Sequence, residues 1–187
     1  MNFLKLRKSC MDRDIPIISQ ETEKFLGNLL EQHKPKVCLE IGSAVGYSSI
    51  FLSNTIKKWG GFLYSFEISY ASYLEGIQNI GKHASKNLIV YPFDFLKIDL
   101  KKLIPNTVDF VFIDGQKSQY ANYLMNIIGV AKENKNILSP KNIIVFDDVI
   151  KFKSKMSSLY GYLEKKQIVY KEIKTEKGDG VILINNG

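Results

Sequence analysis

A glycine-containing segment at residues 38–48 constrains the fold more than any other part of the chain. The apolar run Val37–Ile41 predicts a buried strand, and the residues from Tyr47 onward predict a helix. Gly42 and Gly46 therefore lie in the turn between the two, where a missing Cβ lets the backbone approach a ligand closely. A strand, a glycine turn and a helix in this order are typical of a nucleotide-type cofactor site, although an ordinary connection can show the same pattern.

The spacing of the glycines narrows the kind of cofactor. A dinucleotide loop needs G-x-G-x-x-G, whereas here the glycines are four positions apart and Glu40 lies two positions before the first. The absent middle glycine argues against an NAD-binding oxidoreductase. A carboxylate beside the loop suits a ligand with cationic groups, and S-adenosylmethionine (SAM) carries an amino group and a sulfonium.

Short apolar runs alternate with helical patterns along most of the chain, which predicts an α/β fold with a parallel sheet covered on both faces. The expected strands are Val37–Ile41, Phe62–Phe66, Leu88–Tyr91, Val108–Ile113 and Ile143–Phe146. Helices are expected after Ser19 up to Pro35, over about Tyr47–Lys57, around Leu74–Ile80, over Tyr120–Ala131 and over Ser154–Lys165. The last two strands, Ile168–Ile173 and Val181–Ile184, are too close for a helical crossover, so they should form an antiparallel hairpin.

Composition bounds the class of protein. The 187 residues suit one domain, residues 1–187, with a basic tail at residues 1–14. No targeting signal or membrane-length apolar run is present, and Cys10 and Cys38 form no disulfide framework, so a cytoplasmic protein away from membranes is expected. The net charge of +7 permits an RNA partner. However, only two of the 26 basic residues are arginine, and a genomic bias toward Lys, Asn and Ile explains the charge equally well.

Acidic residues follow the expected strands, and the carboxyl ends of parallel strands share the edge where ligands bind. Glu67 lies 25 positions after Gly42, close to the spacing of a carboxylate that binds ribose hydroxyls; the alternative is an acid that interacts with a helix dipole. Asp94 could accept from an adenine amino group with Phe95 covering the ring, or it could be an exposed turn residue.

Three further acids at this edge, Asp114, Asp147 and Asp148, would repel one another unless a cation lay between them. All-oxygen ligation suits a hard ion such as Mg²⁺. Lys117 is three positions after Asp114, and a divalent cation nearby would lower its pKa and make it a general base. The alternative is a surface lysine paired with Asp114.

Taken together, these segments resemble the cation-dependent O-methyltransferases related to catechol O-methyltransferase, and especially the small bacterial branch that includes tRNA 5-hydroxyuridine methyltransferases. The resemblance runs from about Ile15 to the C-terminus. The segments that carry it are Ile15–Ile18, Leu39–Ser48, Phe66-Glu67, Phe112–Asp114 with Lys117, Gln119 and Tyr120, Asp147-Asp148, and Gly178-Asp179-Gly180.

The resemblance implies a single-domain class I SAM-dependent methyltransferase (Rossmann-like) fold, with a seven-stranded sheet and a C-terminal antiparallel hairpin. It implies Lys117 and Asp114 as catalytic residues, and Asp114, Asp147 and Asp148 as ligands of Mg²⁺ or another hard divalent cation. The residues implied to bind SAM are Ile18, Glu40, Gly42, Ser43, Gly46, Tyr47, Ser48, Glu67, Ile68, Asp94, Phe95 and Asp114. Relatives are commonly dimers, so a homodimer is expected.

Two departures from the family pattern bear on the substrate. The family usually has Asp-Asn where this chain has Asp147-Asp148, and the segment Val149–Ser158 lacks the usual glycine-containing loop. The expected function is metal-assisted methylation of a hydroxyl, with a tRNA wobble 5-hydroxyuridine and a small catechol-like molecule both open as acceptors. Lys5, Arg7, Lys8 and Arg13 of the tail could reach a phosphate backbone. A non-catalytic SAM-binding module is disfavoured, because the acids and Lys117 are all present.

Overall fold

Seven strands form one mixed sheet in the computed structural model, which describes residues 3–84, 86–129, 136–175 and 179–186. The strands are β1 (Val37–Ile41), β2 (Phe62–Phe66), β3 (Leu88–Tyr91), β4 (Val108–Ile113), β5 (Leu138–Phe146), β6 (Lys171–Ile173) and β7 (Val181–Asn185). The α-helices are α1 (Phe3–Asp12), α2 (Gln20–His33), α3 (Tyr47–Ile56), α4 (Tyr70–His83), α5 (Leu100–Leu103), α6 (Tyr120–Ile127) and α7 (Ser157–Lys165). Short 3₁₀ helices are η1 (Lys57–Trp59), η2 (Phe95–Lys97), η3 (Lys117–Gln119) and η4 (Lys153–Lys155).

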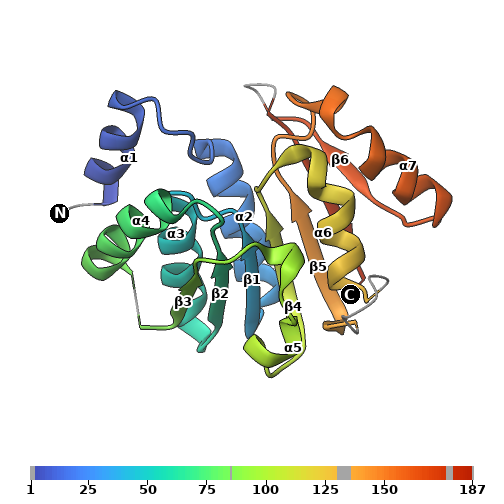
Figure 1. Ribbon diagram of the computed structural model, residues 1–187, viewed down its shortest axis with the longest axis horizontal. Coiled ribbons are helices and arrows are strands. Elements are labelled where there is room, and N and C mark those ends of the chain that lie inside the picture. Colours follow the sequence, from blue (N-terminus) through green and yellow to red (C-terminus); the bar gives the residue numbers. More distant parts are fainter. Residues whose placement is uncertain (1–2, 85, 130–135, 176–178, 187) are drawn as a thin grey trace.

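The strand order is β3-β2-β1-β4-β5-β7-β6, and the strands from β3 to β5 are parallel (Figure 1). Strand β7 pairs antiparallel with both β5 and β6, so the predicted antiparallel hairpin is confirmed. The order reverses between β1 and β4, and ligands bind at such a point beside the carboxyl ends of the strands.

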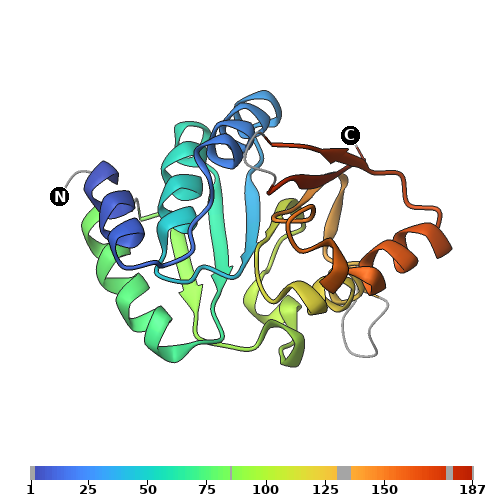
Figure 2. The same cartoon turned by 90° about the horizontal axis from the view of Figure 1, so that it is seen from above.

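Alternating residues of the strands feed two hydrophobic cores, one on each face of the sheet. In β4, Phe110 and Phe112 pack with α1, α2 and α3, whereas Val111 and Ile113 pack with α5, α6 and α7. Figure 2 shows these two groups of helices on opposite faces. Within the described ranges, no helix is long and apolar enough to cross a membrane.

Several boundaries differ from the sequence-based expectation. Strand β5 begins at Leu138, five residues before the apolar run, because its first residue still pairs with Val108 of β4. Helix α7 starts at Ser157 after the turn η4, and α6 ends at Ile127. Ala131 and Gly178, which the sequence analysis also used, lie outside the described residues.

The expected N-terminal tail is instead a helix, α1. Its Leu6 and Cys10 are buried in the core on the α2 and α3 side of the sheet, and the ring of Phe3 stacks on Tyr47 at 4.6 Å between centroids. The apolar spacing of these residues is helical, but the three basic residues between Lys5 and Lys8 obscured it. The segment is thus part of the folded domain.

Gly42 is required by contact between backbones. Its φ of +96° favours glycine, and a Cβ atom at this position would lie 2.6 Å from the carbonyl oxygen of Asp114 and 2.8 Å from Cα of Gly115. Gly46, at φ +84°, similarly leaves room for Gly76 and Ile80 of α4. The two glycines therefore let the loop after β1 pack against neighbouring parts of the protein. From the sequence alone, the missing Cβ atoms had been explained by the approach of a ligand.

We predict that Gly42→Ala lowers the free energy of unfolding by about 3 kcal/mol or more, since it adds both backbone strain and a clash with a fixed carbonyl. Urea unfolding measures the loss. The matched control is Gly81→Ala in α4, where an added Cβ meets nothing within 4 Å. That variant should gain up to about 1 kcal/mol from helix propensity. Equal effects of the two substitutions would contradict the packing role of Gly42.

Candidate active site

A cavity of about 620 Å³ lies at the carboxyl edge of the sheet. Its walls come from the loop before α2, the loops after β1, β2, β3 and β4, and the segment after β5. The lining residues that the sequence analysis had selected are Ile18, Gly42, Ser43, Tyr47, Ser48, Glu67, Ile68, Asp94, Phe95, Asp114, Lys117, Asp147 and Asp148. The structure thus brings nearly the whole predicted set to one cavity.

Glu40 is one exception, because it is fully buried behind the cavity wall and is not among the lining residues that the structure describes. Its Oε2 accepts hydrogen bonds from the hydroxyls of Ser49 and Ser65, the latter at 2.6 Å. Burial raises the pKa of Glu40 to about 7, although hydrogen bonds from serines, Ser48 among them, oppose the shift. A direct contact between Glu40 and SAM is therefore not what this geometry provides. Glu40 instead supports Ser48, which does line the cavity.

The raised pKa of Glu40 predicts a pH-dependent stability. Between its unfolded value near 4.5 and its folded value of about 7, the folded chain keeps a proton that the unfolded chain has released. Wild-type stability should therefore fall as the pH rises through this window, and Glu40→Gln, which cannot ionise, should escape roughly 3 kcal/mol of that loss. Urea unfolding of both proteins at the two ends of the window checks this. Parallel stability curves would show that Glu40 is not buried in its acidic form.

Glu67 follows β2 and reaches the cavity with both carboxylate oxygens already held by backbone. Its Oε2 accepts from the amide of Ala44 at 2.7 Å, and its Oε1 accepts from the amide of Ser69 at 2.7 Å. These bonds fix the carboxylate beside the loop after β1, and each oxygen retains a lone pair for a ligand hydroxyl. The position suits the ribose role predicted from the spacing.

The residues expected around an adenine ring have different environments. Asp94 caps η2 by accepting from the amide of Leu96 at 3.1 Å, and its carboxylate still borders the cavity. Phe95 is buried, in edge-to-face contact with Phe66 and Tyr123, so its ring belongs to the core beneath the cavity. Ile68, in contrast, is 72% exposed at the rim. Ile68 is therefore the apolar side chain of this group whose surface is available to a ligand.

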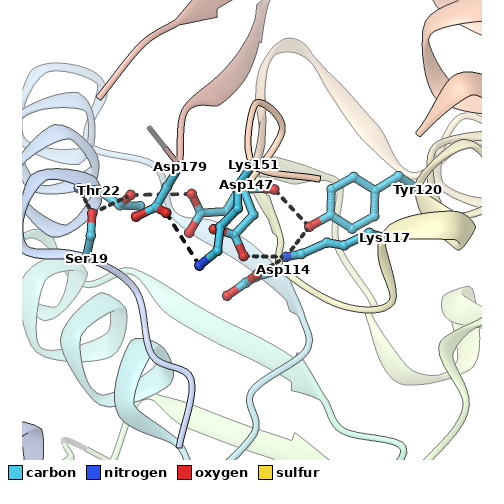
Figure 3. A network of polar contacts seen from close by, with 9 residues as sticks. Ser19, Thr22, Asp114, Lys117, Tyr120, Asp147, Lys151 and Asp179 are labelled. Atoms are coloured by element: carbon cyan, nitrogen blue, oxygen red, sulfur yellow. Dashed lines mark hydrogen bonds and ion pairs between the residues drawn. The ribbon is translucent and has the colours of Figure 1, made fainter. Parts of the chain in front are cut away.

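Lys117, in η3, lies between two of the predicted metal ligands. Its Nζ is 2.5 Å from Oδ1 of Asp114 and 3.2 Å from Oδ2 of Asp148, and it donates a hydrogen bond to the hydroxyl of Tyr120 at 2.9 Å (Figure 3). Asp148 adopts φ +60°, in the left-handed region that Asp and Asn tolerate better than most residues. The geometry is that of a partly buried ammonium held by two carboxylates and a phenol.

Asp147 points away from Lys117 and toward α2. Its Oδ1 accepts a hydrogen bond from the hydroxyl of buried Thr22 at 3.3 Å, and its backbone carbonyl accepts from Tyr120 at 3.1 Å (Figure 3). Ser19, which caps α2, donates to Thr22 in turn at 3.1 Å. A chain of hydrogen bonds therefore joins the start of α2 to the acid cluster.

The electrostatics of the cluster follow from burial and crowding. Burial, and then the charges of Asp114 and Asp148, raise the pKa of Asp147 well above its usual value. Burial by itself would lower the pKa of Lys117, but Asp114 and Asp148 outweigh this, so the pKa is raised. The lowered pKa predicted from the sequence presupposed a cation beside the lysine. The ammonium of Lys117 forms ion pairs with both Asp114 and Asp148.

The side chains of the acid cluster have the chemistry that a divalent cation requires. Three carboxylates in a partly buried site are the hard oxygen donors that Mg²⁺ prefers. Burial, and then the charges of Asp114 and Asp148, raise the pKa of Asp147, and a cation would relieve this crowding of acids. In the side-chain arrangement seen here, no three acidic, histidine or cysteine residues among those described are grouped closely enough to hold a metal. The donor set thus fits a hard cation, while the present arrangement is an ion-pair cluster centred on Lys117.

Some residues of the site were missed from the sequence. Thr22 is a polar residue on the face of α2 that is otherwise formed by Leu26, Leu29 and Leu30. A polar residue on an apolar helix face was the sequence signal that could have identified it. Lys151 lines the cavity and pairs with Asp179 at 3.6 Å (Figure 3), but no local pattern places that loop at the cavity.

Comparisons with known proteins agree with this fold and site. The family model described as O-methyltransferase matches residues 3–184. Caffeoyl-CoA O-methyltransferase 2 of Populus trichocarpa is 28% identical over 124 residues, which are 64% of this chain and 50% of that protein. The chain therefore spans about half the length of this curated relative.

Solved structures share the fold at low sequence identity. The O-methyltransferase from Bacillus cereus in complex with SAH has a TM-score of 0.80 and 20% identity, with 98% of this chain and 89% of that chain covered. TomG from Streptomyces achromogenes in complex with SAM has a TM-score of 0.79 and 19% identity, with 99% and 89% covered.

The strand order, the antiparallel β7 and these likenesses define a class I SAM-dependent methyltransferase fold. Because the family model covers nearly the whole chain, the chain belongs to the O-methyltransferase family.

Proposed function

We propose that this protein transfers a methyl group from SAM to a hydroxyl oxygen of an acceptor, assisted by a divalent cation such as Mg²⁺. The observation that carries the proposal is a single cavity with two chemically different sides. The loop after β1 and Glu67 form a side suited to a nucleoside cofactor. Asp114, Lys117 and Asp148 form a side suited to acid–base work on an acceptor.

The cofactor would lie along the first of these sides. Ser43, Tyr47 and Ser48 line it from the loop after β1 and the start of α3, Glu67 would bind the ribose, and Ile68 offers an apolar surface to the base. Gly42 lines the cavity and would present its backbone to the cofactor, whereas Gly46 is not among the described lining residues and shapes the loop from behind. The likeness to structures determined with SAM and SAH supports this placement.

The acid cluster would hold the cation and the acceptor. Asp114, Asp147 and Asp148 would bind the ion, which when bound supplies Lewis-acid stabilisation of negative charge on the acceptor oxygen. Lys117 is held by Asp114 and Tyr120. In its neutral form, its Nζ would accept the proton of the acceptor hydroxyl. The new O–CH₃ bond forms as the S–CH₃ bond breaks, leaving SAH and a protonated lysine. Holding both reactants in line would supply much of the rate.

We propose an anionic acceptor, because lysines and an aromatic ring lie together at one part of the rim. Lys151 and Lys155 lie 5.4 Å and 5.2 Å from the ring centroid of Phe152, and Phe152 and Lys151 line the cavity. Cationic and aromatic side chains together suit the phosphates and bases of RNA. A wobble 5-hydroxyuridine of tRNA is therefore our proposed acceptor, and a small catechol-like molecule is the alternative. The resemblance also implies a homodimer, and light scattering checks the mass in solution.

We predict that Lys117→Ala lowers methyl transfer by about 100-fold or more, because a positioned base typically contributes that much. SAM binding, measured by calorimetry, should persist. The control is Lys102→Ala, which removes a lysine that pairs with Asp99, likewise three positions earlier, on the surface. Wild-type turnover in Lys117→Ala would refute the base assignment.

Transfer of tritium from labelled SAM to bulk tRNA and to a catechol panel, with Mg²⁺ or with EDTA, tests the acceptor and the cation together. We expect label in tRNA and its loss with EDTA. The double variant Lys151→Ala, Lys155→Ala should weaken transfer to tRNA. The slope of log affinity against log salt concentration should fall by about two, which corresponds to the loss of two phosphate contacts. Label in catechols alone would support the alternative acceptor, and activity that is insensitive to EDTA would remove the cation from the mechanism.

A further inference from the structure

Arg7 of α1 connects three parts of the protein that meet at the cofactor side of the cavity. Its Nη2 lies 2.7 Å from Oε2 of Glu23 in α2 and donates to the backbone carbonyl of Ile18 at 3.1 Å. Its Nε donates to the hydroxyl of Tyr47, the first residue of α3, at 2.9 Å. Tyr47 in turn donates to Glu23 at 2.8 Å, which closes the network.

Two of these partners form the cavity wall. Ile18 and Tyr47 both line the cavity, and the neighbouring residues Pro16, Ile17 and Ser19 line it as well. The guanidinium lies 4.9 Å from the ring centroid of Tyr47, and the Arg7 side chain is only 13% exposed. The network therefore holds the segment before α2 against the start of α3, which puts a fixed edge on the cofactor side.

We propose that Arg7 is a positioning residue for SAM binding, an inference that rests on the function proposed above. Without the guanidinium, the carbonyl of Ile18 loses its donor, and the Pro16–Ser19 segment is no longer tied to Tyr47. The cavity wall then has its binding-competent form in only a fraction of the molecules, and the apparent affinity for cofactor falls by that fraction. Once SAM is bound, the wall is in place, so the chemical step is unaffected.

Arginine is the residue that this geometry needs. A planar guanidinium presents several donors in a fixed arrangement and can serve the carboxylate, the carbonyl and the hydroxyl at once, whereas a lysine ammonium is a single point charge on a flexible stem. This removes Arg7 from the residues expected to contact an RNA backbone. Arg13 is also paired within the chain, with Glu75 of α4 at 2.7 Å, but it is 51% exposed and not among the described residues that line the cavity.

The test is calorimetric binding of SAM to the full chain without acceptor, followed by steady-state kinetics. Arg7→Met keeps an apolar stem over Tyr47 and should raise the Kd for SAM by about tenfold, with Arg7→Lys between it and wild type. At saturating SAM, kcat and the KM for the acceptor should stay within about twofold of wild type. A role limited to stability would lower the unfolding midpoint and leave the Kd unchanged.

Arg13→Met is the matched control, because it removes the other arginine ion pair at the N-terminus. Its Kd for SAM should stay within about twofold of wild type. An unchanged Kd in Arg7→Met, or an equal rise in Arg13→Met, would overturn the inference while leaving the proposed function standing. If Arg7→Met fails to fold, Glu23→Gln carries the test, and an unchanged Kd there would count against the inference. Failure of the wild-type chain to bind SAM would overturn the proposed function itself.

Discussion

The close approach of Gly42 to the backbone at Asp114 and Gly115 brings the two halves of the site together. Strands β1 and β4 are neighbours at the centre of the sheet, and the loops that follow them must leave its edge side by side. The distances that a Cβ atom at Gly42 would have show that no side chain fits between these loops. Because of this contact, a cofactor on the first loop and a lysine after the second would face the same cavity.

Ion pairs within the protein offset part of the acidic charge around that cavity. Lys117 compensates Asp114 and Asp148, Arg7 compensates Glu23, and Lys151 faces Asp179. Asp147 has no such ion pair with a basic residue among those described, and burial, followed by the charges of Asp114 and Asp148, raises its pKa. A cation bound by the three acids would add positive charge beside the ammonium of Lys117, and this charge would lower the pKa of the lysine. The base role proposed for Lys117 therefore depends on the proposed cation, because the carboxylates by themselves raise the pKa of the lysine.

The sequence predicted what depends on local pattern. The five parallel strands, the hairpin and the convergence of acids at one edge follow from apolar runs that end in Glu or Asp. It could not predict which side chains turn inward at those ends. Glu40 and Glu67 each follow a similar pattern, yet Glu40 is buried beneath serines and Glu67 faces the cavity. That difference depends on neighbouring elements, and the same reason hid the contacts of Thr22 and Arg7.

The positions of the two arginines in the sequence have a structural explanation. In a chain where lysine supplies nearly all positive charge, a general bias cannot explain why two positions keep arginine. Both lie within or directly after α1, and both use more than one guanidinium nitrogen to hold another element. Arginine therefore appears where geometry matters, while the exposed lysines carry charge that any cation could supply. The net charge of +7 alone therefore does not identify a partner.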